Sequence, residues 1–358
     1  MDYFSNAYFL LIGFVLLSST VVMPYSVSLS LLAICFSVLY YFKEKKSTIK
    51  DKVVIITGCD SGFGNQLARL LDSKGAIVFA GCLDEKSKGA LDLKMHCTEN
   101  LRVVKLNITL DEDVINLCKI IESFLIKSSK ELWALVNNAG LNFLGEVEWT
   151  PLQLFEKVLN VNMYGTIRMS KAFLPFLRKS QGRLINVTSV KGRLSYPANG
   201  PYTMSKHAIT TFTDQLRMEL KPFNVKVILA EPGNFGGSTG MLLNNERERE
   251  LEIMWESSSD DVKETYGKEY IFHYLKAIKN SIPTANKDLN LVSMDILKAL
   301  TAVHPYVRYT TGGSCFFYDY DKLLMNVSPY LPTVLIDYLM TKYCYAGFPN
   351  PIKALKIR

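Results

Sequence analysis

A tyrosine and a lysine four residues apart, Tyr202 and Lys206, have the residue types for proton transfer. We expect a helix over Ser205–Leu220, and a spacing of four places two side chains on one helix face. A lysine cation beside a phenol favours the phenolate, which should lower the tyrosine pKa from its usual value of about 10. Tyr202 would then act as a general acid or base near neutral pH. The same spacing also occurs in ordinary aromatic–lysine contacts, so the pair needs support from other residues.

Ser189 gives part of that support. It lies thirteen residues before Tyr202, just after an apolar run at 183–187 that predicts a buried strand. A hydroxyl at the end of that strand can hydrogen-bond the oxygen of a carbonyl or an alcohol.

The glycine-rich segment 58–64 indicates a nucleotide site. It lies between an apolar strand at 52–57 and a helical pattern at 65–74, and a second strand follows at 76–81. A strand, a glycine turn, a helix and a strand within about 30 residues are typical of the mononucleotide-binding βαβ unit. Glycines allow the turn to close tightly and the backbone to approach a pyrophosphate, which binds at the helix N-terminus.

Further strands are predicted at 101–106, 132–136, 183–187 and 225–229, with helices between them. This alternation predicts an α/β fold, a Rossmann-type doubly wound parallel sheet with both faces covered, in a single catalytic domain. Functional groups gather at the carboxyl ends of such strands. The residues found there are Asn137, Ser189 and Glu231-Pro232-Gly233.

The order of these motifs resembles that of the short-chain dehydrogenase/reductase family over roughly 52–235. The matching segments are Thr57-Gly58-x-x-x-Gly62-x-Gly64, Asn137-Asn138-Ala139-Gly140, Asn162, Ser189, Tyr202-x-x-x-Lys206 and Pro232-Gly233. Several motifs in register are far more specific than any one of them. The resemblance therefore carries the expectation of an oxidoreductase that uses a nicotinamide cofactor.

The resemblance implies a role for each catalytic residue. Tyr202 takes the alcohol proton while a hydride passes to the nicotinamide, and Ser189 holds the substrate oxygen. Lys206 lowers the tyrosine pKa and binds the nicotinamide ribose, and Asn162 holds a water in the proton relay. The residues expected to bind the cofactor are Thr57, Gly58, Asp60, Ser61, Gly62, Phe63, Gly64, Asp84, Asn107, Asn138, Ala139, Gly140, Tyr202, Lys206, Pro232 and Gly233. No metal site is expected.

Two departures from the family pattern concern the cofactor. The acid that usually selects NAD by binding its ribose hydroxyls is replaced by Cys82, with Asp84 two residues later. No arginine stands at this strand end to meet a 2′-phosphate, although Lys86 and Lys88 are near, so NAD is favoured over NADP. The threonine that many relatives carry four residues after the glycine of Pro-Gly is Gly237 here, with Ser238 and Thr239 next.

The first fifty residues read as a membrane anchor. No charged residue occurs from Ala7 to Phe42, which is long enough for one tilted span or for two short spans broken at Pro24. Four lysines follow by position 50 and place the catalytic part on the cytosolic side. They also contribute about half of the net charge of +7, and no basic stripe interleaved with aromatics suggests nucleic-acid binding.

We divide the chain into the anchor at 1–50, a Rossmann core at 51–240, a substrate lid at 241–300 and a C-terminal extension at 301–358. The aromatic residues of the lid predict either an apolar wall for the substrate or the packing of a helix pair. The extension is apolar and aromatic with a basic end. It suits either an interfacial membrane contact near the substrate mouth or a plain C-terminal helix.

These observations favour a membrane-anchored, NAD-dependent oxidoreductase for a secondary or lipophilic alcohol, such as a hydroxysteroid or a retinoid. Within the family, the chain resembles retinol dehydrogenases, 17β-hydroxysteroid dehydrogenase type 2 and 3-hydroxybutyrate dehydrogenase. The alternatives are therefore 3-hydroxybutyrate oxidation and a catalytically silent binding protein. We expect the endoplasmic reticulum membrane as its location, with the mitochondrial membrane as alternative, and a homo-oligomer.

Overall fold

The computed structural model describes residues 45–239, 246–281, 285–314 and 319–344, with 30, 33, 34 and 351 as single positions. Almost all of the expected membrane anchor, including its uncharged stretch, lies outside these residues. Among the residues described, no helix is both long enough and apolar enough to cross a bilayer.

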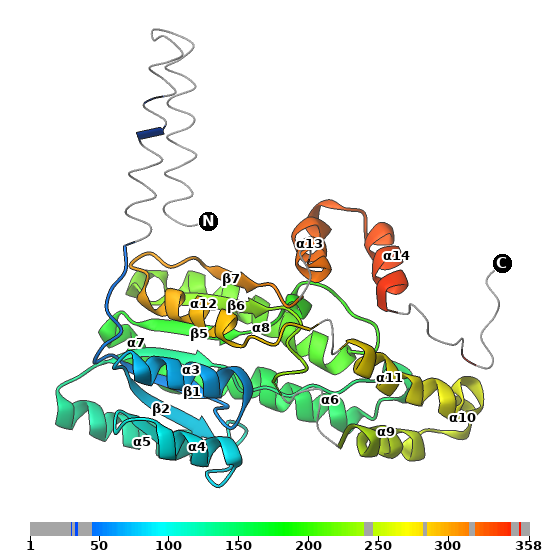
Figure 1. Ribbon diagram of the computed structural model, residues 1–358, viewed down its shortest axis with the longest axis horizontal. Coiled ribbons are helices and arrows are strands. Elements are labelled where there is room, and N and C mark those ends of the chain that lie inside the picture. The colour runs from blue at the N-terminus through cyan, green and yellow to red at the C-terminus, as the bar shows by residue number, and fades with distance from the viewer. Residues whose placement is uncertain are drawn as a thin grey trace.

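A parallel sheet forms the centre of the molecule (Figure 1). Its strand order in the described chain is β3-β2-β1-β4-β5-β6-β7, and every neighbouring pair is parallel. The order in which the strands are added to the sheet reverses between β1 and β4, which is where doubly wound sheets bind ligands. The strands are β1 (Val53–Thr57), β2 (Ile77–Cys82), β3 (Leu101–Lys105), β4 (Leu132–Asn137), β5 (Arg183–Val187), β6 (Lys226–Pro232) and β7 (Arg308–Thr311).

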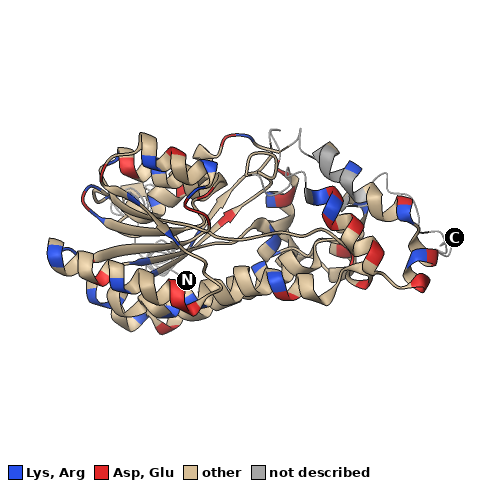
Figure 2. Ribbon diagram, turned by 90° about the horizontal axis from the view of Figure 1, so that it is seen from below, with Lys and Arg blue, Asp and Glu red and all other residues tan. Residues whose placement is uncertain are grey.

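Helices cover both faces of this sheet, as expected for strands that are apolar on both sides. One hydrophobic cluster packs α3, α4 and α12 on the sheet, and a second packs α5, α7 and α8 on the other face. Figure 2 shows the charged residues mainly on the helices, while the strands carry few. The helices are α3 (Gly62–Ser73), α4 (Lys88–His96), α5 (Asp111–Ser128), α6 (Leu152–Leu159), α7 (Thr166–Ser180), α8 (Gly200–Glu219), α9 (Glu246–Ser257), α10 (Asp260–Tyr266), α11 (Lys268–Ser281), α12 (Asn290–Thr301), α13 (Tyr320–Val327) and α14 (Thr333–Cys344).

The predicted α/β fold with a parallel Rossmann-type sheet is confirmed, but the predicted divisions after residues 240 and 300 are not those of the structure. Helix α12, assigned to the lid, packs in the core cluster against the sheet. Strand β7, assigned to the C-terminal extension, pairs with β6 along Leu229–Pro232. The prediction ended the core at the Pro-Gly turn because the last motif lies there. A strand of four residues with only alternate positions buried gives a weak sequence signal.

The end of the predicted anchor also belongs to the folded core. The backbone of Lys45 accepts a hydrogen bond from the amide of Val303 at 2.8 Å, and the amide of Ser47 donates to Thr301 at 2.7 Å. Ile49 is buried in the cluster around α3 and α12. The chain therefore enters the domain beside the end of α12.

Candidate active site

A cavity of about 1040 Å³ lies at the carboxyl edge of the sheet. Residues just beyond the ends of four neighbouring strands line it: Gly58 after β1, Asn138 after β4, Ser189 after β5 and Gly233 after β6. Parallel strands bring these distant segments to one edge, so the topology alone gathers the predicted motifs.

The glycine turn between β1 and α3 has the form that a phosphate group needs. Gly58 has a φ of +71°, and a Cβ there would lie 2.8 Å from the Cα of Ala139. The first hydrogen bond of the helix runs from the amide of Asn65 to the carbonyl of Ser61 at 3.3 Å. The amides of the preceding residues of α3 lie ahead of that bond, and its first turn carries no acidic residue. This helix N-terminus therefore suits the pyrophosphate of a dinucleotide.

Thr57 and Asn138 hold this turn against the neighbouring strand. The hydroxyl of Thr57 accepts hydrogen bonds from the amides of Asn138 and Ala139, both at 3.0 Å. The Asn138 side chain donates to the carbonyls of Thr57 at 2.9 Å and Gly58 at 3.1 Å. These bonds join the end of β1 to the end of β4, at the point where the order of strand addition reverses.

Asp60 brings a carboxylate to the end of β2, although the chain has Cys82 at the position where an acid was expected. Its two oxygens accept hydrogen bonds from the amides of Leu83 at 2.9 Å and Asp84 at 3.0 Å. Cys82 is fully buried, and burial raises its thiol pKa to about 12. A negative charge therefore stands at this strand end, supplied by the glycine turn.

Ser189, Tyr202 and Lys206 lie together on the wall of the cavity and are each more than nine-tenths buried. The hydroxyl of Ser189 donates to the carbonyl of Pro232 at 3.3 Å and accepts from the amide of Lys191 at 3.2 Å. Helix α8 begins at Gly200, five residues before the predicted start, so Tyr202 lies in its first turn. The ammonium of Lys206 lies 5.5 Å from the centre of the Tyr202 ring and donates to the carbonyl of Val187 at 3.0 Å.

The expected lowering of the Tyr202 pKa is not what this site produces. Burial raises the pKa of Tyr202 to about 12, against a smaller lowering by its hydrogen-bond partner Ser189. Burial also lowers the pKa of Lys206 to about 8. The prediction counted the attraction between the two side chains and omitted the loss of water around both, which is the larger effect here.

Asn162 does not line the cavity; it lies in the π-helical turn Asn160–Gly165 between α6 and α7. Its side chain accepts from the amide of Leu141 at 2.8 Å and donates to the hydroxyl of Ser205 and the carbonyl of Leu141, both at 2.9 Å. It therefore ties the loop after β4 to helix α8. Such widened turns are common near functional sites.

The sequence of the chain matches those of known proteins, and these matches show its family. A family profile described as "short chain dehydrogenase" matches residues 52–250, more than half of the chain. The chain belongs to the short-chain dehydrogenases. It is 40% identical to retinol dehydrogenase 16 of Rattus norvegicus over 326 residues, covering 89% of this chain and 96% of that protein. It is also 40% identical to the mitochondrial D-beta-hydroxybutyrate dehydrogenase of Bos taurus over 264 residues, covering 73% and 77% of the two chains.

A solved structure shows the same fold at lower identity. The short chain dehydrogenase of Burkholderia cenocepacia, in complex with NADP, superposes with a TM-score of 0.61 at 23% identity and covers 82% of this chain and 100% of its own. The predicted family and the predicted class of enzyme, an oxidoreductase, are thus confirmed.

The cavity of this short-chain dehydrogenase is lined by most of the predicted site residues, but not by all of them. Among the residues proposed for catalysis and cofactor binding, Thr57, Gly64, Asp84 and Asn162 do not line it. Thr57 and Asn162 hold neighbouring segments in place, and Gly64 packs against the turn itself. Asp84 is exposed and accepts a hydrogen bond from the amide of Lys86 at 2.9 Å. Thr239, which the sequence left without a role, lines the cavity beside Gly62.

The predicted lid contributes to the wall of the cavity, but its described aromatic residues do not line it. They pack with Phe143 and Trp149 in a separate hydrophobic cluster; the described ones are Trp255, Tyr266, Tyr270 and Phe272. The lid residues that face the cavity are polar: Arg247, Glu250, His273, Lys276 and Asn280. The packing alternative is therefore the correct one, because the apolar sides of these helices are used to attach the lid. Aromatic lining comes from elsewhere, with Phe143, Tyr196 and Tyr343.

Asp321 of α13 is a cavity residue that the sequence gave no means of finding. Burial raises the pKa of its carboxyl, while a hydrogen bond from Tyr196 and the charge of Lys191 act in the opposite direction. All three side chains line the cavity. Asp321 lies more than a hundred residues from Lys191 and Tyr196 in the sequence, so no local pattern could join it to them.

Proposed function

We propose that this protein is an NAD-dependent, membrane-bound dehydrogenase that oxidises a secondary or lipophilic alcohol, such as a hydroxysteroid or a retinoid. One observation carries the proposal: Ser189, Tyr202 and Lys206 line the same cavity as the glycine turn at the start of α3. A proton-transfer group and a dinucleotide site thus share one space.

The residues of the chain divide the proposed work between them. The glycine turn after β1 and the strand end at Gly233 would hold NAD, which would supply a hydride acceptor for the carbinol carbon. The phenol oxygen of Tyr202 takes the hydroxyl proton, and the hydroxyl of Ser189 donates a hydrogen bond to the same substrate oxygen. The ammonium of Lys206, 5.5 Å from the ring centre, stabilises the phenolate and binds the nicotinamide ribose. Asn162 orients the loop after β4 against α8.

Asp60 supports the assignment of NAD as the cofactor. Its carboxylate stands at the end of β2, where the adenosine ribose lies in this fold, and would repel a 2′-phosphate. We expect Asp60→Asn to lower the preference for NAD over NADP, as a ratio of kcat/KM values, by about tenfold, equivalent to ~1.4 kcal/mol. Steady-state kinetics with both cofactors measures this ratio.

The same kinetic measurement on Asp84→Asn shows which of the two acids, Asp60 or Asp84, selects NAD over NADP. Asp84 is exposed and does not line the cavity, so its substitution should change the preference less than about twofold. A large change for Asp84→Asn with none for Asp60→Asn would assign the selection to Asp84.

The relatives support a lipophilic alcohol as the substrate. The retinol dehydrogenase match extends over 89% of the chain, and the hydroxybutyrate dehydrogenase match over 73%. A second candidate, 3-hydroxybutyrate, is favoured by a specific feature of the cavity. Five cations line it, Lys157, Lys191, Lys206, Arg247 and Lys276, against the carboxylates of Asp60, Glu250 and Asp321. This excess of positive charge would attract a substrate carboxylate.

NADH formation by the detergent-solubilised protein separates these functions. Retinol, hydroxysteroids and 3-hydroxybutyrate are offered in turn. Turnover of the lipophilic alcohols supports the proposal, and turnover of 3-hydroxybutyrate alone supports the second candidate. NADH binding without turnover of any substrate would indicate a silent binding protein.

The helices α13 and α14 form a hairpin (Figure 1). This hairpin supports a membrane contact beside the cavity, because Asp321 and Tyr343 of the hairpin line it. One side packs on Val190 and Tyr196. The other side leaves large apolar residues exposed: Leu323, Tyr330, Val334, Leu335 and Tyr338. An apolar surface of this kind suits the interface of a bilayer. The lysines after the uncharged N-terminal stretch support a cytosolic position of the catalytic part. The proposed membrane is that of the endoplasmic reticulum, with the mitochondrial membrane as the alternative.

We expect the double substitution of Tyr330→Ser and Val334→Glu to raise KM severalfold for retinol presented in phospholipid vesicles. Both side chains are at least 80% exposed, so the fold should be unaffected. A substrate dissolved in detergent micelles should show little change, because it no longer enters from a bilayer. The matched control is Ile126→Glu, on an equally exposed isoleucine of α5. Equal effects of the control and the double variant would contradict the contact.

A further inference from the structure

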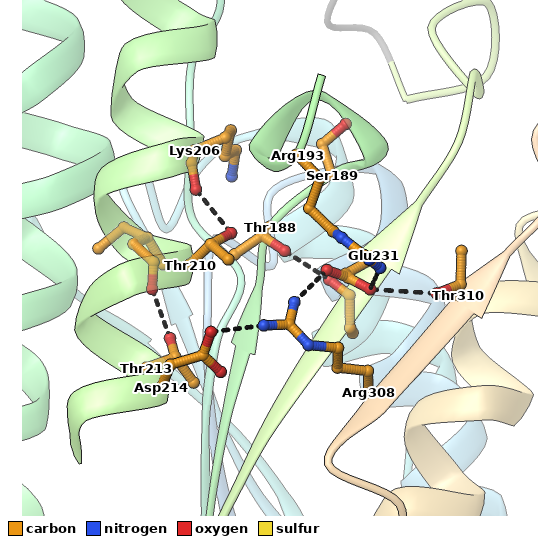
Figure 3. A network of polar contacts seen from close by, with 12 residues as sticks. Thr188, Ser189, Arg193, Lys206, Thr210, Thr213, Asp214, Glu231, Arg308 and Thr310 are labelled. Atoms are coloured by element: carbon orange, nitrogen blue, oxygen red, sulfur yellow. Dashed lines mark hydrogen bonds and ion pairs between the residues drawn. The ribbon is translucent and has the colours of Figure 1, made fainter. Parts of the chain in front are cut away.

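Glu231 is a fully buried carboxylate that lies outside the cavity, at the end of β6. It directly precedes Pro232 and Gly233, which do line the cavity. Its oxygens accept hydrogen bonds from Arg308 at 2.6 Å and from the hydroxyl of Thr310 at 3.1 Å, both on β7 (Figure 3). A carboxylate without water needs such partners, and here strand β7 supplies two of them.

The partners of Glu231 reach the two other elements that carry the site. Arg308 donates its second nitrogen to Asp214 of α8 at 2.5 Å, so one guanidinium joins β6, β7 and the helix of Tyr202 (Figure 3). Arg193 lies 3.8 Å from Glu231. It directly follows the short helical turn Val190–Gly192, which begins after Ser189.

The turn after Ser189 is closely packed between these elements. A Cβ on Gly192 would lie 3.0 Å from the carbonyl oxygen of Lys206 and 2.6 Å from the hydroxyl of Thr210, so the turn rests on the backbone of α8. On its other side, the Ser189 hydroxyl donates to the carbonyl of Pro232, the residue next to Glu231. A shift at the end of β6 would therefore move Ser189 relative to Tyr202.

We propose that Glu231 is a positioning residue for the reaction, a buried anion that fixes the Ser189 turn and the Pro232-Gly233 end of β6 against helix α8. The inference rests on the proposed function. It adds a residue outside the cavity to the group that sets the reaction geometry. Its physical basis is the charge: without it, Arg308 and Arg193 face each other around a neutral side chain, and the strand end and the turn separate. A displacement of about 1 Å can lower a rate by about 10²-fold.

Glu231→Gln keeps the size of the side chain and removes the charge. We expect kcat for alcohol oxidation to fall by about tenfold or more. KM for NAD should change less than kcat, because the Pro232-Gly233 part of the cofactor site adjoins Glu231 but the glycine turn does not. In a Ser189→Ala background, the same substitution should lower kcat less than about twofold further, because its effect passes through Ser189. Effects that multiply in the double variant would overturn the proposal.

Asp72→Asn is the matched control for a loss of stability alone. Asp72 is a buried carboxylate of α3 that accepts hydrogen bonds from the amide of Thr98 at 2.9 Å and its hydroxyl at 2.6 Å, away from the cavity. It should lower Tm without lowering kcat, and a Glu231→Gln variant that behaves the same way would overturn the positioning role.

Hydrogen exchange provides a readout without turnover. Glu231→Gln should speed exchange in 188–193, and Asp72→Asn should not; unchanged exchange in 188–193 would also overturn the proposal. Absence of turnover in the wild type would instead count against the proposed function.

Discussion

Tyr202→Phe is expected to lower kcat for alcohol oxidation by about 10²–10⁴-fold, the usual contribution of a positioned acid or base. The substitution removes a single oxygen from a ring that is 8% exposed and packed at the start of α8. No buried partner loses its only bond, because Ser189 still donates to Pro232. The fold and the affinity for NADH should therefore remain. NADH formation and a fluorescence titration with NADH measure the two quantities on the same sample.

Tyr306→Phe is a suitable control for that experiment. Tyr306 precedes β7 and does not line the cavity, so kcat should stay within about twofold of the wild-type value. A Tyr202→Phe variant that retains a tenth or more of the wild-type kcat would show that another group accepts the proton. A variant that loses NADH binding together with turnover would indicate a structural role for the phenol instead.

The pH dependence of the wild type follows from the same residue. Oxidation needs the phenolate of Tyr202, and burial raises the pKa of this phenol to about 12. The phenolate fraction then grows with each pH step below that value, so the oxidation rate should rise with pH until Lys206, whose pKa burial lowers to about 8, loses its proton. Carbonyl reduction needs the phenol, which is fully present at neutral pH. The reduction rate should therefore be nearly constant from about pH 6 to 7 and fall above about pH 8, where Lys206 loses its proton.

The sheet and most of the cavity wall could be predicted because their signals are local. Strand β1 reads as an unbroken run of β-branched residues and is buried at every position. The glycine turn follows it at once, and the strands β4, β5 and β6 are each followed or ended by a polar motif. Once the strands are taken as parallel, their ends must meet at one edge. The sequence therefore placed Gly58, Asn138, Ser189 and Pro232 correctly without any knowledge of contacts.

The remaining parts depend on contacts between distant segments, which a single sequence does not contain. Asp60 reaches Leu83 across 23 positions and supplies the charge that Cys82 lacks. Arg308 meets Glu231 across 77 positions, and no local sequence pattern joins the two residues. The short strand β7 is recognisable only through its pairing with β6. For the same reason the aromatic residues of the lid predicted packing or substrate contact equally well.

The error over the Tyr202 pKa has a different origin. Spacing of four residues predicts that the phenol and the ammonium are neighbours, and they are. It carries no information on how much water surrounds them. In the folded protein both side chains are more than nine-tenths buried, and each charged form loses its hydration. The site thus disfavours both the phenolate and the ammonium, which makes Lys206 a source of instability as well as a functional group.

Lys206→Met is therefore expected to reduce kcat by about 10²-fold or more while leaving the protein as stable as the wild type, or more stable. Burial lowers the pKa of this lysine from 10.5 to about 8. At pH 7 the folded chain still holds the proton, and this difference corresponds to about 3 kcal/mol of lost stability. Methionine fills a similar volume without a charge. The lost hydrogen bond to Val187 offsets only about 1 kcal/mol of that gain.

The linkage between pH and stability separates this explanation from simple repacking. Between about pH 8 and 10.5 the unfolded lysine keeps its proton and the folded one releases it, so wild-type stability rises with pH in this window. The variant lacks this rise, and its advantage over the wild type should be largest at pH 7 and vanish near pH 10.5. Lys226→Met, at the amino end of β6 and outside the cavity, should keep its kcat. Denaturation of Lys206→Met at both pH values is the measurement, and a fall in Tm of more than about 4 °C at pH 7 would show that the lysine stabilises the fold.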